Sequence, residues 1–275
     1  MSANLKTAAL TGFWDLSVEQ PSLGGLLVLR QELEMLAESR RADSIDLIVN
    51  GHEPSFLHDA LRSTFRWNIR EGSDLADSWP PSSERTSSGF TYGSFARVLR
   101  LWKQTSLRPR LRWPESLLTA TQKKIAPWLP LISVHLKWTS PFRPEKSNAE
   151  PQEWRSFFAA NAKRRFLVLG DESPREATSG LKNVTLAHEL GLSLAEQLCS
   201  VTLSQGFLGM SSSFCQCAIF SRIPYAVFKH PSHHAHEMTV ELGESEDWAF
   251  AETRQKMWLT RATADKLQEA LDLLL

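Results

Sequence analysis

The segment GFLGMSSSFCQCAIFSRIPYAVFKH, residues 206–230, constrains the fold more strongly than any other part of the chain. It predicts a short apolar strand at Phe207-Leu208, a turn of small residues over Gly209–Ser213, a helix over Phe214–Ser221 and a second strand over Tyr225–Phe228. A strand, a helix and a second strand in this order form a βαβ unit with parallel strands. The segment therefore predicts an α/β fold in which the turn lies at the carboxyl edge of a sheet.

The turn after the first of these strands has the composition of an anion site. A helix that begins directly after a strand leaves backbone N–H groups without acceptors, and these groups together with the helix dipole attract phosphate. The candidate ligands of the anion are the turn residues Gly209, Met210, Ser211, Ser212 and Ser213, and the residues Lys229 and His230 at the end of the next strand. The alternative is an ordinary βαβ unit in which a serine only caps the helix.

Strands and helices alternate through the rest of the chain as well. Ser193 and Glu196 have the spacing of a capping box at the start of a helix over Ser193–Leu203. The other expected elements include strands over Thr7–Trp14, Ser44–Val49, Leu131–Leu136, Arg165–Leu169 and Asn183–Ala187, a helix with one buried stripe over Pro21–Ala42, and an amphipathic C-terminal helix over Thr263–Leu275. This alternation is typical of parallel sheets.

A change in composition at residues 106–114, where arginines alternate with prolines, marks the passage between two halves of the chain. We expect a boundary between Thr119 and Pro130, which gives an N-terminal domain at 1–122 and a C-terminal domain at 123–275. A chain of 275 residues is long enough for two domains that each bury a core. The expected fold is two Rossmann-like α/β domains that face a cleft, and the cleft is the default place for a ligand.

The overall charge argues against a polyelectrolyte partner. Lysine and arginine together number 31, as do aspartate and glutamate, so we expect no nucleic acid as partner. The three cysteines are odd in number and lack CxxC spacing, which is typical of reduced thiols in the cytoplasm. No signal peptide is evident, and no apolar run approaches the roughly 20 residues of a membrane span. Any contact with the inner face of the membrane would be peripheral.

Several catalytic classes lose their usual sequence support. The chain has no GxSxG, GxxxxGK[ST] or GxGxxG pattern, and its cysteines lack an activating context. The run HPSHHAHE at residues 230–237 raises the question of a metal, but Pro231 interrupts it and no second pair of ligands stands elsewhere. We therefore expect no metal and no cofactor.

Polar residues follow three further strands of the second half. Lys137 follows the strand over Leu131–Leu136, and its alternative role is that of a solvated lysine. The remaining strand-end candidates are Gly170, Asp171 and Glu172 after one strand and His188 and Glu189 after the next. A carboxylate in such a position holds ribose hydroxyls in dinucleotide folds, although exposed acidic residues at strand ends are also common.

The order VHLKW, FLVLGDE, NVTLAHELG, LSLAEQL, GFLGMSSSFCQCAIF and PYAVFKHP resembles the C-terminal, donor-binding half of GT-B glycosyltransferases. The resemblance is to heptosyltransferase-like and fucosyltransferase-like enzymes of cell-surface polysaccharide synthesis, and it spans about Leu131–Pro231. It implies metal-independent transfer of a sugar from a nucleotide-sugar donor to a glycan or lipid-linked acceptor. The donor itself is a substrate, so the resemblance implies no cofactor.

A leaving nucleoside diphosphate develops negative charge, which a metal-free site must meet with cations and N–H donors. Lys137, Lys229 and the serines of the turn are candidates for this role. In an inverting transfer a general base must also take the acceptor proton. We expect this base to be Asp15, just past the first strand, with Glu19 as the reserve and a simple turn residue as the alternative.

The chain departs from the family pattern within the serine run. The family has Ser-Gly after the strand, where this chain has Ser212-Ser213, and the second serine brings a Cβ to a place of close backbone approach. This departure and the short N-terminal half favour the alternative function, a catalytically inactive GT-B-like scaffold that binds a nucleotide or a glycan.

Overall fold

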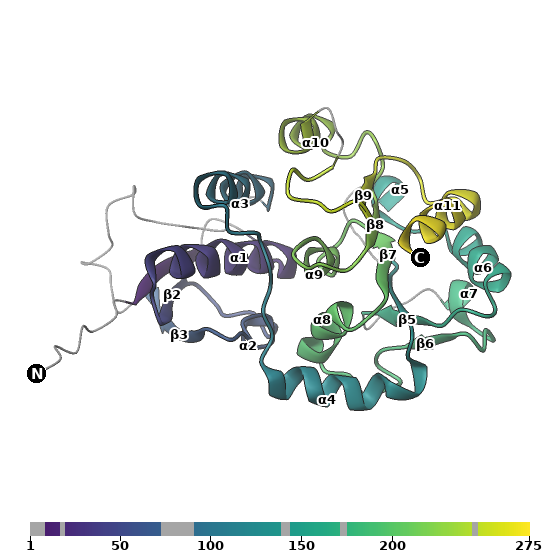
Figure 1. Ribbon diagram of the computed structural model, residues 1–275, viewed down its shortest axis with the longest axis horizontal. Coiled ribbons are helices and arrows are strands. Elements are labelled where there is room, and N and C mark those ends of the chain that lie inside the picture. The colour runs from purple at the N-terminus through teal and green to yellow at the C-terminus, as the bar shows by residue number, and fades with distance from the viewer. Residues whose placement is uncertain (1–8, 17–19, 73–90, 139–143, 171–174, 244–246) are drawn as a thin grey trace, which may run out of the picture. The chain divides into compact units, whose positions relative to one another are not determined.

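The computed structural model describes residues 9–16, 20–72, 91–138, 144–170, 175–243 and 247–275. The chain forms two compact units, Met1–Arg112 and Trp113–Leu275, each with its own parallel sheet (Figure 1). None of the helices in the described ranges combines the length and the apolar character that crossing a bilayer requires.

The division between the units lies before the helix α4 (Glu115–Ile125), whereas the sequence predicted a boundary at 122/123, inside this helix. α4 packs on α8 (Leu194–Thr202) of the second unit. Lys124 Nζ donates to Glu196 Oε2 at 2.7 Å and to the Gly191 carbonyl at 2.9 Å. These contacts attach α4 to the C-terminal unit.

The N-terminal unit is a three-stranded parallel sheet in the order β1-β2-β3. Its described elements are β1 (Leu10–Asp15), α1 (Leu23–Arg40), β2 (Ser44–Asn50), α2 (Leu57–Ala60), β3 (Arg66–Glu71) and α3 (Thr91–Thr105). The predicted βαβ unit with parallel strands is confirmed, because β1 pairs in parallel with β2 after the intervening helix.

α1 is buried on more than the one stripe that the sequence predicted. It contacts β1 and β2 on one side and α3 on another, so even its polar residues are covered. Arg30 is fully buried and binds Glu34 Oε1 at 2.7 Å and two backbone carbonyls, those of Ala60 and Arg112. Because these partners satisfy its guanidinium, Arg30 can be buried without leaving an unpaired charge.

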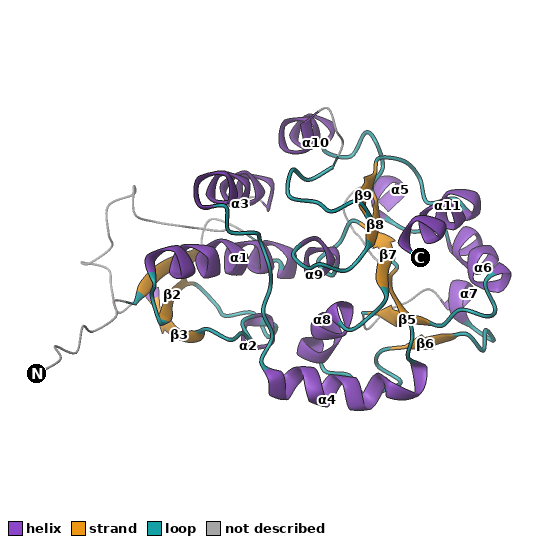
Figure 2. Ribbon diagram, viewed as in Figure 1, coloured by secondary structure: helices purple, strands orange, loops and turns teal. Residues whose placement is uncertain are grey.

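The described strands of the C-terminal unit form a six-stranded parallel sheet in the order β6-β5-β4-β7-β8-β9 (Figure 2). They are β4 (Ile132–His135), β5 (Phe166–Leu169), β6 (Val184–Leu186), β7 (Gly206–Met210), β8 (Tyr225–Phe228) and β9 (Gln255–Trp258). Besides α4 and α8, the helices are α5 (Pro144–Ser147), α6 (Pro151–Ala160), α7 (Arg175–Thr178), α9 (Cys215–Ile219), α10 (Ala235–Leu242) and α11 (Ala264–Leu274), with a 3-10 turn at Ala126–Trp128. Both sheets are parallel, as the sequence predicted.

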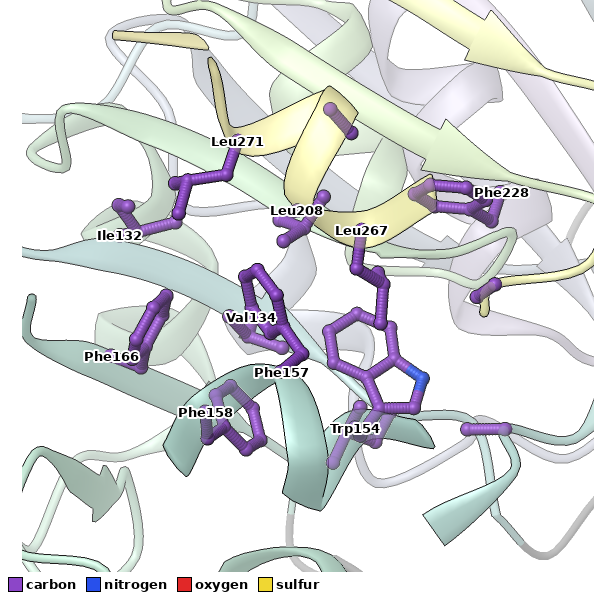
Figure 3. Close-up of a cluster of buried hydrophobic side chains, with 14 of the residues drawn as sticks. Ile132, Val134, Trp154, Phe157, Phe158, Phe166, Leu208, Phe228, Leu267 and Leu271 are labelled. Atoms are coloured by element: carbon purple, nitrogen blue, oxygen red, sulfur yellow. The ribbon is translucent and has the colours of Figure 1, made fainter. Parts of the chain in front are cut away.

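Helices cover both faces of this sheet (Figure 1). α6 and α11 pack together on one face, and α8 and α9 pack together on the other side. A hydrophobic core lies under α6 and α11, where Trp154, Phe157 and Phe158 of α6 meet Leu267 and Leu271 of α11 beside the strands (Figure 3). The C-terminal helix thus buries its apolar side. Thr263 is its N-cap, and the Thr263 side chain accepts a hydrogen bond from the Lys266 N–H.

Candidate functional site

The C-terminal sheet reverses its strand order between β4 and β7. The chain runs outward from β4 to β6 on one side and from β7 to β9 on the other, which makes this pair the topological switch point where α/β sheets bind ligands. His135 of β4 pairs with Gly209 of β7, and Met210 pairs with Phe228 of β8. Since the strands are parallel and in register, the residues that follow β4, β7 and β8 begin side by side at one edge.

Gly209 is required by the close approach of β4 and β7. A Cβ at this position would lie 2.8 Å from the His135 carbonyl oxygen and 3.0 Å from the His135 nitrogen. The prediction that Gly209 and Met210 belong to the turn is wrong, because both are the last residues of β7 and the turn begins at Ser211. Gly209 thereby brings the ends of two strands together, and it does not itself lie in the turn.

The serine bend, residues 211–214, carries backbone donors without acceptors. The Ser211 N–H donates to the Phe228 carbonyl at 2.8 Å and so extends the pairing of β7 with β8. Among the residues that the structure describes, the N–H groups of Ser212, Ser213 and Phe214 donate to no acceptor, and the buried Ser212 Oγ has no partner. The bend therefore presents a cluster of hydrogen-bond donors, of which the Ser212 hydroxyl is buried.

The helix after the bend is shorter than the sequence predicted. α9 spans Cys215–Ile219 rather than Phe214–Ser221, so it has little more than one turn and adds only a small dipole to the bend. The individual N–H groups and serine hydroxyls, and not the dipole, are therefore the donors that the bend offers to an anion.

Lys137 and Lys229 both act on Cys215, the first residue after the bend. Burial raises the pKa of the Cys215 thiol to about 11, while a backbone hydrogen bond of Ser212 and the charges of Lys229 and Lys137 oppose this shift. The thiol itself donates to the Ser212 carbonyl at 2.8 Å. Lys229 is only 3 % exposed. Desolvation lowers the pKa of Lys137, which forms no ion pair with any described residue. The two lysines thus converge beside the serine bend. Because the Cys215 pKa is raised, the thiol stays protonated at neutral pH and is a poor nucleophile there.

His135 lies at the same edge, at the end of β4. Its ring contacts that of Phe214 in a tilted arrangement with the centroids 4.7 Å apart, and its Nδ1 has no hydrogen-bond partner within the described ranges. Desolvation, and secondly the charge of Lys137, lower the pKa of His135 to about 3. The imidazole is therefore neutral at physiological pH and adds no charge to the two lysines.

The candidates after β5 and β6 lie away from the serine bend. β6 is separated from β7 by β5 and β4, so at about 4.8 Å per strand its end is roughly 14 Å from the bend. His188 and Glu189 are exposed there, and the Gly170 N–H after β5 donates to Gln197 Oε1 at 2.8 Å. The predicted residues Asp171 and Glu172 lie outside the described residues. The structure brings Lys137, Lys229 and the serines together, but it does not bring His188 or Glu189 to them.

A pocket of about 140 Å³ opens at the carboxyl edge on the α6 and α11 side of the sheet. Met210 and His230 line it, together with groups that the sequence reading missed, among them Lys146, Arg261 and Glu145. Desolvation and the charges of Arg261 and Lys146 lower the pKa of His230, which Glu145 opposes. Arg261 follows β9 and Lys146 lies on α5, and neither element was predicted, so no strand-end argument pointed to them.

Among the residues that the structure describes, the histidine run forms no metal site with its neighbours. Within the described part of the chain, no group of three or more His, Cys, Asp or Glu side chains is arranged to hold a metal ion. The rings of His233 and His234 lie 4.4 Å apart, and His234 has a left-handed backbone before α10.

Asp15 lies at the carboxyl end of β1 in the N-terminal sheet. Its register partner is Asn50, the last residue of β2, and Asn50 Nδ2 donates to Asp15 Oδ1 at 2.9 Å. The preceding residue Trp14 is buried and contacts Phe56, the residue just before α2, with the ring centroids 6.4 Å apart. The carboxylate is thus held at a sheet edge beside a rigid aromatic residue, and the reserve candidate Glu19 lies outside the described residues.

No protein-family model and no curated protein matches the sequence. The fold, however, is similar to that of several solved glycosyltransferases. An ADP-heptose lipopolysaccharide heptosyltransferase II of E. coli matches with a TM-score of 0.62 at 13% identity, over 96% of this chain and 98% of that one. The E. coli heptosyltransferase WaaC with ADP matches with a TM-score of 0.58 at 10% identity, over 96% and 100%.

A third similar structure is the dodecameric, iron-containing heptosyltransferase TibC in complex with ADP-D-beta-D-heptose. Its TM-score is 0.51 at 12% identity, over 98% of this chain and 77% of that one. These likenesses show the GT-B-type α/β fold, which the sequence predicted.

Proposed function

We propose that this protein is a glycosyltransferase that moves a sugar from a nucleotide-sugar donor to a hydroxyl group of a glycan or lipid-linked acceptor in cell-surface polysaccharide synthesis. One observation carries the proposal. Lys137 and Lys229 converge beside a bend with unpaired N–H groups, at the switch point of a sheet whose fold resembles that of heptosyltransferases.

The serine bend and the two lysines suit a diphosphate. The bend offers the N–H groups of Ser212, Ser213 and Phe214 and the buried Ser212 hydroxyl, and the lysines supply positive charge in a partly desolvated place. Such preorganised donors stabilise charge as it develops on a leaving group. Within this proposal the two lysines compensate the charge of the leaving group, and the transfer needs no metal ion.

The pocket suits the sugar of the donor. It combines carboxylates, which accept hydrogen bonds from hydroxyl groups, with Lys146 and Arg261, which donate them. Met210 and Ala262 add an apolar surface for C–H groups. Met210 directly precedes the serine bend and His230 directly follows Lys229, so a sugar in the pocket would be continuous with a diphosphate at the bend.

The bond changes of the proposed transfer are balanced. The acceptor oxygen bonds to the anomeric carbon, the bond from that carbon to the diphosphate oxygen breaks, and the electron pair leaves with the diphosphate. Asp15 takes the proton of the acceptor hydroxyl, as a general base does in an inverting transfer. The three free cysteines are consistent with a cytoplasmic location, which we propose together with peripheral contact at the inner face of the membrane where the acceptor is lipid-linked.

Calorimetric titration with ADP, UDP, GDP and CDP, each with a corresponding nucleotide-sugar, tests the donor. We expect the nucleotides of one nucleobase to bind with a Kd in the micromolar range, which is typical of enzyme substrates, both with and without a chelator. Lack of binding of every nucleotide at millimolar concentration would refute the proposal. Binding without hydrolysis or transfer to any acceptor would favour the alternative, an inactive nucleotide-binding scaffold.

Replacement of Asp15 by asparagine tests the base separately from the donor. We expect turnover to fall by roughly 10²–10⁴-fold, the usual contribution of a general base, while nucleotide affinity stays the same. Asp59→Asn is the matched control, since Asp59 lies in α2 of the same unit and its carboxylate forms a 3.7 Å surface ion pair with Arg62. Unchanged turnover of the Asp15 variant would remove this residue as the base.

A further inference from the structure

Asn50 is bound to the candidate base through its side-chain amide. β1 and β2 are in register, so the last residues of the two strands, Asp15 and Asn50, stand side by side at the carboxyl edge. Asn50 Nδ2 donates to Asp15 Oδ1 at 2.9 Å, and the Leu16 N–H donates to the Asn50 carbonyl at 2.7 Å. The two strands therefore stay paired beyond the carboxylate.

Two glycines allow close packing at the strand end that carries Asn50. Gly51 has φ +111°, and a Cβ there would lie 3.0 Å from Leu16 Cβ. A Cβ on Gly72, after β3, would lie 3.1 Å from Asn50 Cβ and 3.2 Å from Asn50 Cα. A side chain on Gly51 would press on Leu16 and one on Gly72 on the base of Asn50, so the ends of β1, β2 and β3 pack closely at this edge.

We propose that Asn50 is a positioning residue for the sugar transfer, which orients the Asp15 carboxylate toward the acceptor hydroxyl through the Nδ2–Oδ1 hydrogen bond. The inference rests on the proposed function, because it gives Asp15 the role of base. It adds a residue that the family resemblance did not assign.

A neutral amide suits this task better than a charged group. A hydrogen bond from an amide fixes one carboxylate oxygen without the full charge of a lysine or arginine, which would make the carboxylate a weaker base. A carboxylate at position 50 would instead share a proton with Asp15. Glu71, exposed at the end of β3, is the next carboxylate along this edge.

The same sheet offers a matched control pair. Asn68 of β3 donates from Nδ2 to Asp46 Oδ1 of β2 at 2.7 Å, and these two residues are also register partners. Asp46 additionally pairs with Arg70 at 2.8 Å, and the pair lies within the strands and not at their carboxyl ends. Asn50→Leu and Asn68→Leu therefore remove the same kind of hydrogen bond from the same unit, one beside the candidate base and one away from it.

The test measures transfer by the full-length chain with its nucleotide-sugar, together with thermal unfolding of each variant. For Asn50→Leu we expect kcat to fall by about 10- to 150-fold, the range for a hydrogen bond to a charged group, with the KM for the donor unchanged. Asn50→Leu should cause no further loss of turnover in an Asp15→Ala background, because Asn50 acts only through the Asp15 carboxylate. Asn50→Asp, which has the same shape, should move the acid limb of kcat/KM to higher pH.

Three results would overturn the inference while leaving the donor site intact. They are normal turnover of Asn50→Leu, an equal loss in Asn68→Leu, and an undiminished effect of Asn50→Leu in the Asp15→Ala background. Failure of the proposed function gives a different pattern. The unaltered protein would then bind no nucleotide or show no transfer, or the Asp15 variant would be fully active, and the inference would fall with it.

Discussion

Replacing Lys137 by methionine should have opposite effects on folding and on ligand binding. Desolvation lowers the pKa of Lys137, so the folded protein holds its charged form at a cost relative to the unfolded chain. A lysine whose pKa is lowered in the folded state destabilises the fold at pH values below that pKa, and stability rises as the pH passes upward toward the ordinary value of 10.5. Lys137→Met removes this cost, and the free protein should become more stable at pH 7.

Ligand binding should weaken in the same variant. A hydrogen bond between a lysine and a phosphate oxygen contributes about 1.5–3 kcal/mol, which corresponds to a loss of roughly 10- to 150-fold in affinity for a nucleoside diphosphate. At a ligand concentration 100 times the Kd, the unaltered protein gains about 2.7 kcal/mol, or roughly 5–10 °C in Tm for a unit of this size. A variant with 100-fold weaker affinity gains about 0.4 kcal/mol at that concentration, or about 1 °C.

Differential scanning calorimetry with and without the nucleotide, combined with isothermal titration, measures both effects. Lys163→Met is the matched control, because Lys163 is exposed and precedes β5, at the opposite edge of the same sheet. The control should change neither quantity. The reasoning would be refuted if Lys137→Met bound the nucleotide as tightly as the unaltered protein, or if affinity fell only in parallel with a loss of stability.

The remaining predictions concern single groups in both units. Burial raises the pKa of Glu32 to about 7 against the opposing charge of Arg97, so the folded state keeps a proton that the unfolded state loses. The stability of the N-terminal unit should therefore fall as the pH rises from about 4.5 to about 7, and Glu32→Gln should flatten this slope in thermal unfolding scans. The raised pKa of Cys215 predicts that iodoacetamide leaves this thiol unmodified at pH 8 in the folded protein and modifies it after denaturation, and mass spectrometry that found rapid native labelling would contradict this. Gly209→Ala should lower the free energy of unfolding by about 1–3 kcal/mol in urea titrations, because the new Cβ meets the backbone of His135, and a neutral effect would show that β4 and β7 can separate without cost.

Local patterns in the sequence were enough to predict most of the elements around the donor site. The strand over Tyr225–Phe228 has the predicted bounds, and Ser193 with Glu196 forms the predicted capping box with both of its hydrogen bonds. Such features depend on side chains within a few residues of one another, so they can be predicted from the sequence without knowledge of the fold. β9 was missed because Gln255 and Lys256 make its sequence look polar, although Gln255 is buried and donates to two backbone carbonyls, those of Ser221 and Ile223.

The sequence by itself determined that strands and helices alternate, that parallel sheets result, and that serines and lysines follow the strands. Only the tertiary structure decided which strand ends become neighbours. Strand order sets Lys137 beside a bend far along the chain and leaves Glu189 on the other side of β5, and the packing of three strand ends joins Asn50 to Asp15. The physical reason is that local propensity acts over one or two turns of chain, whereas strand order follows from the burial of whole sheet faces under helices.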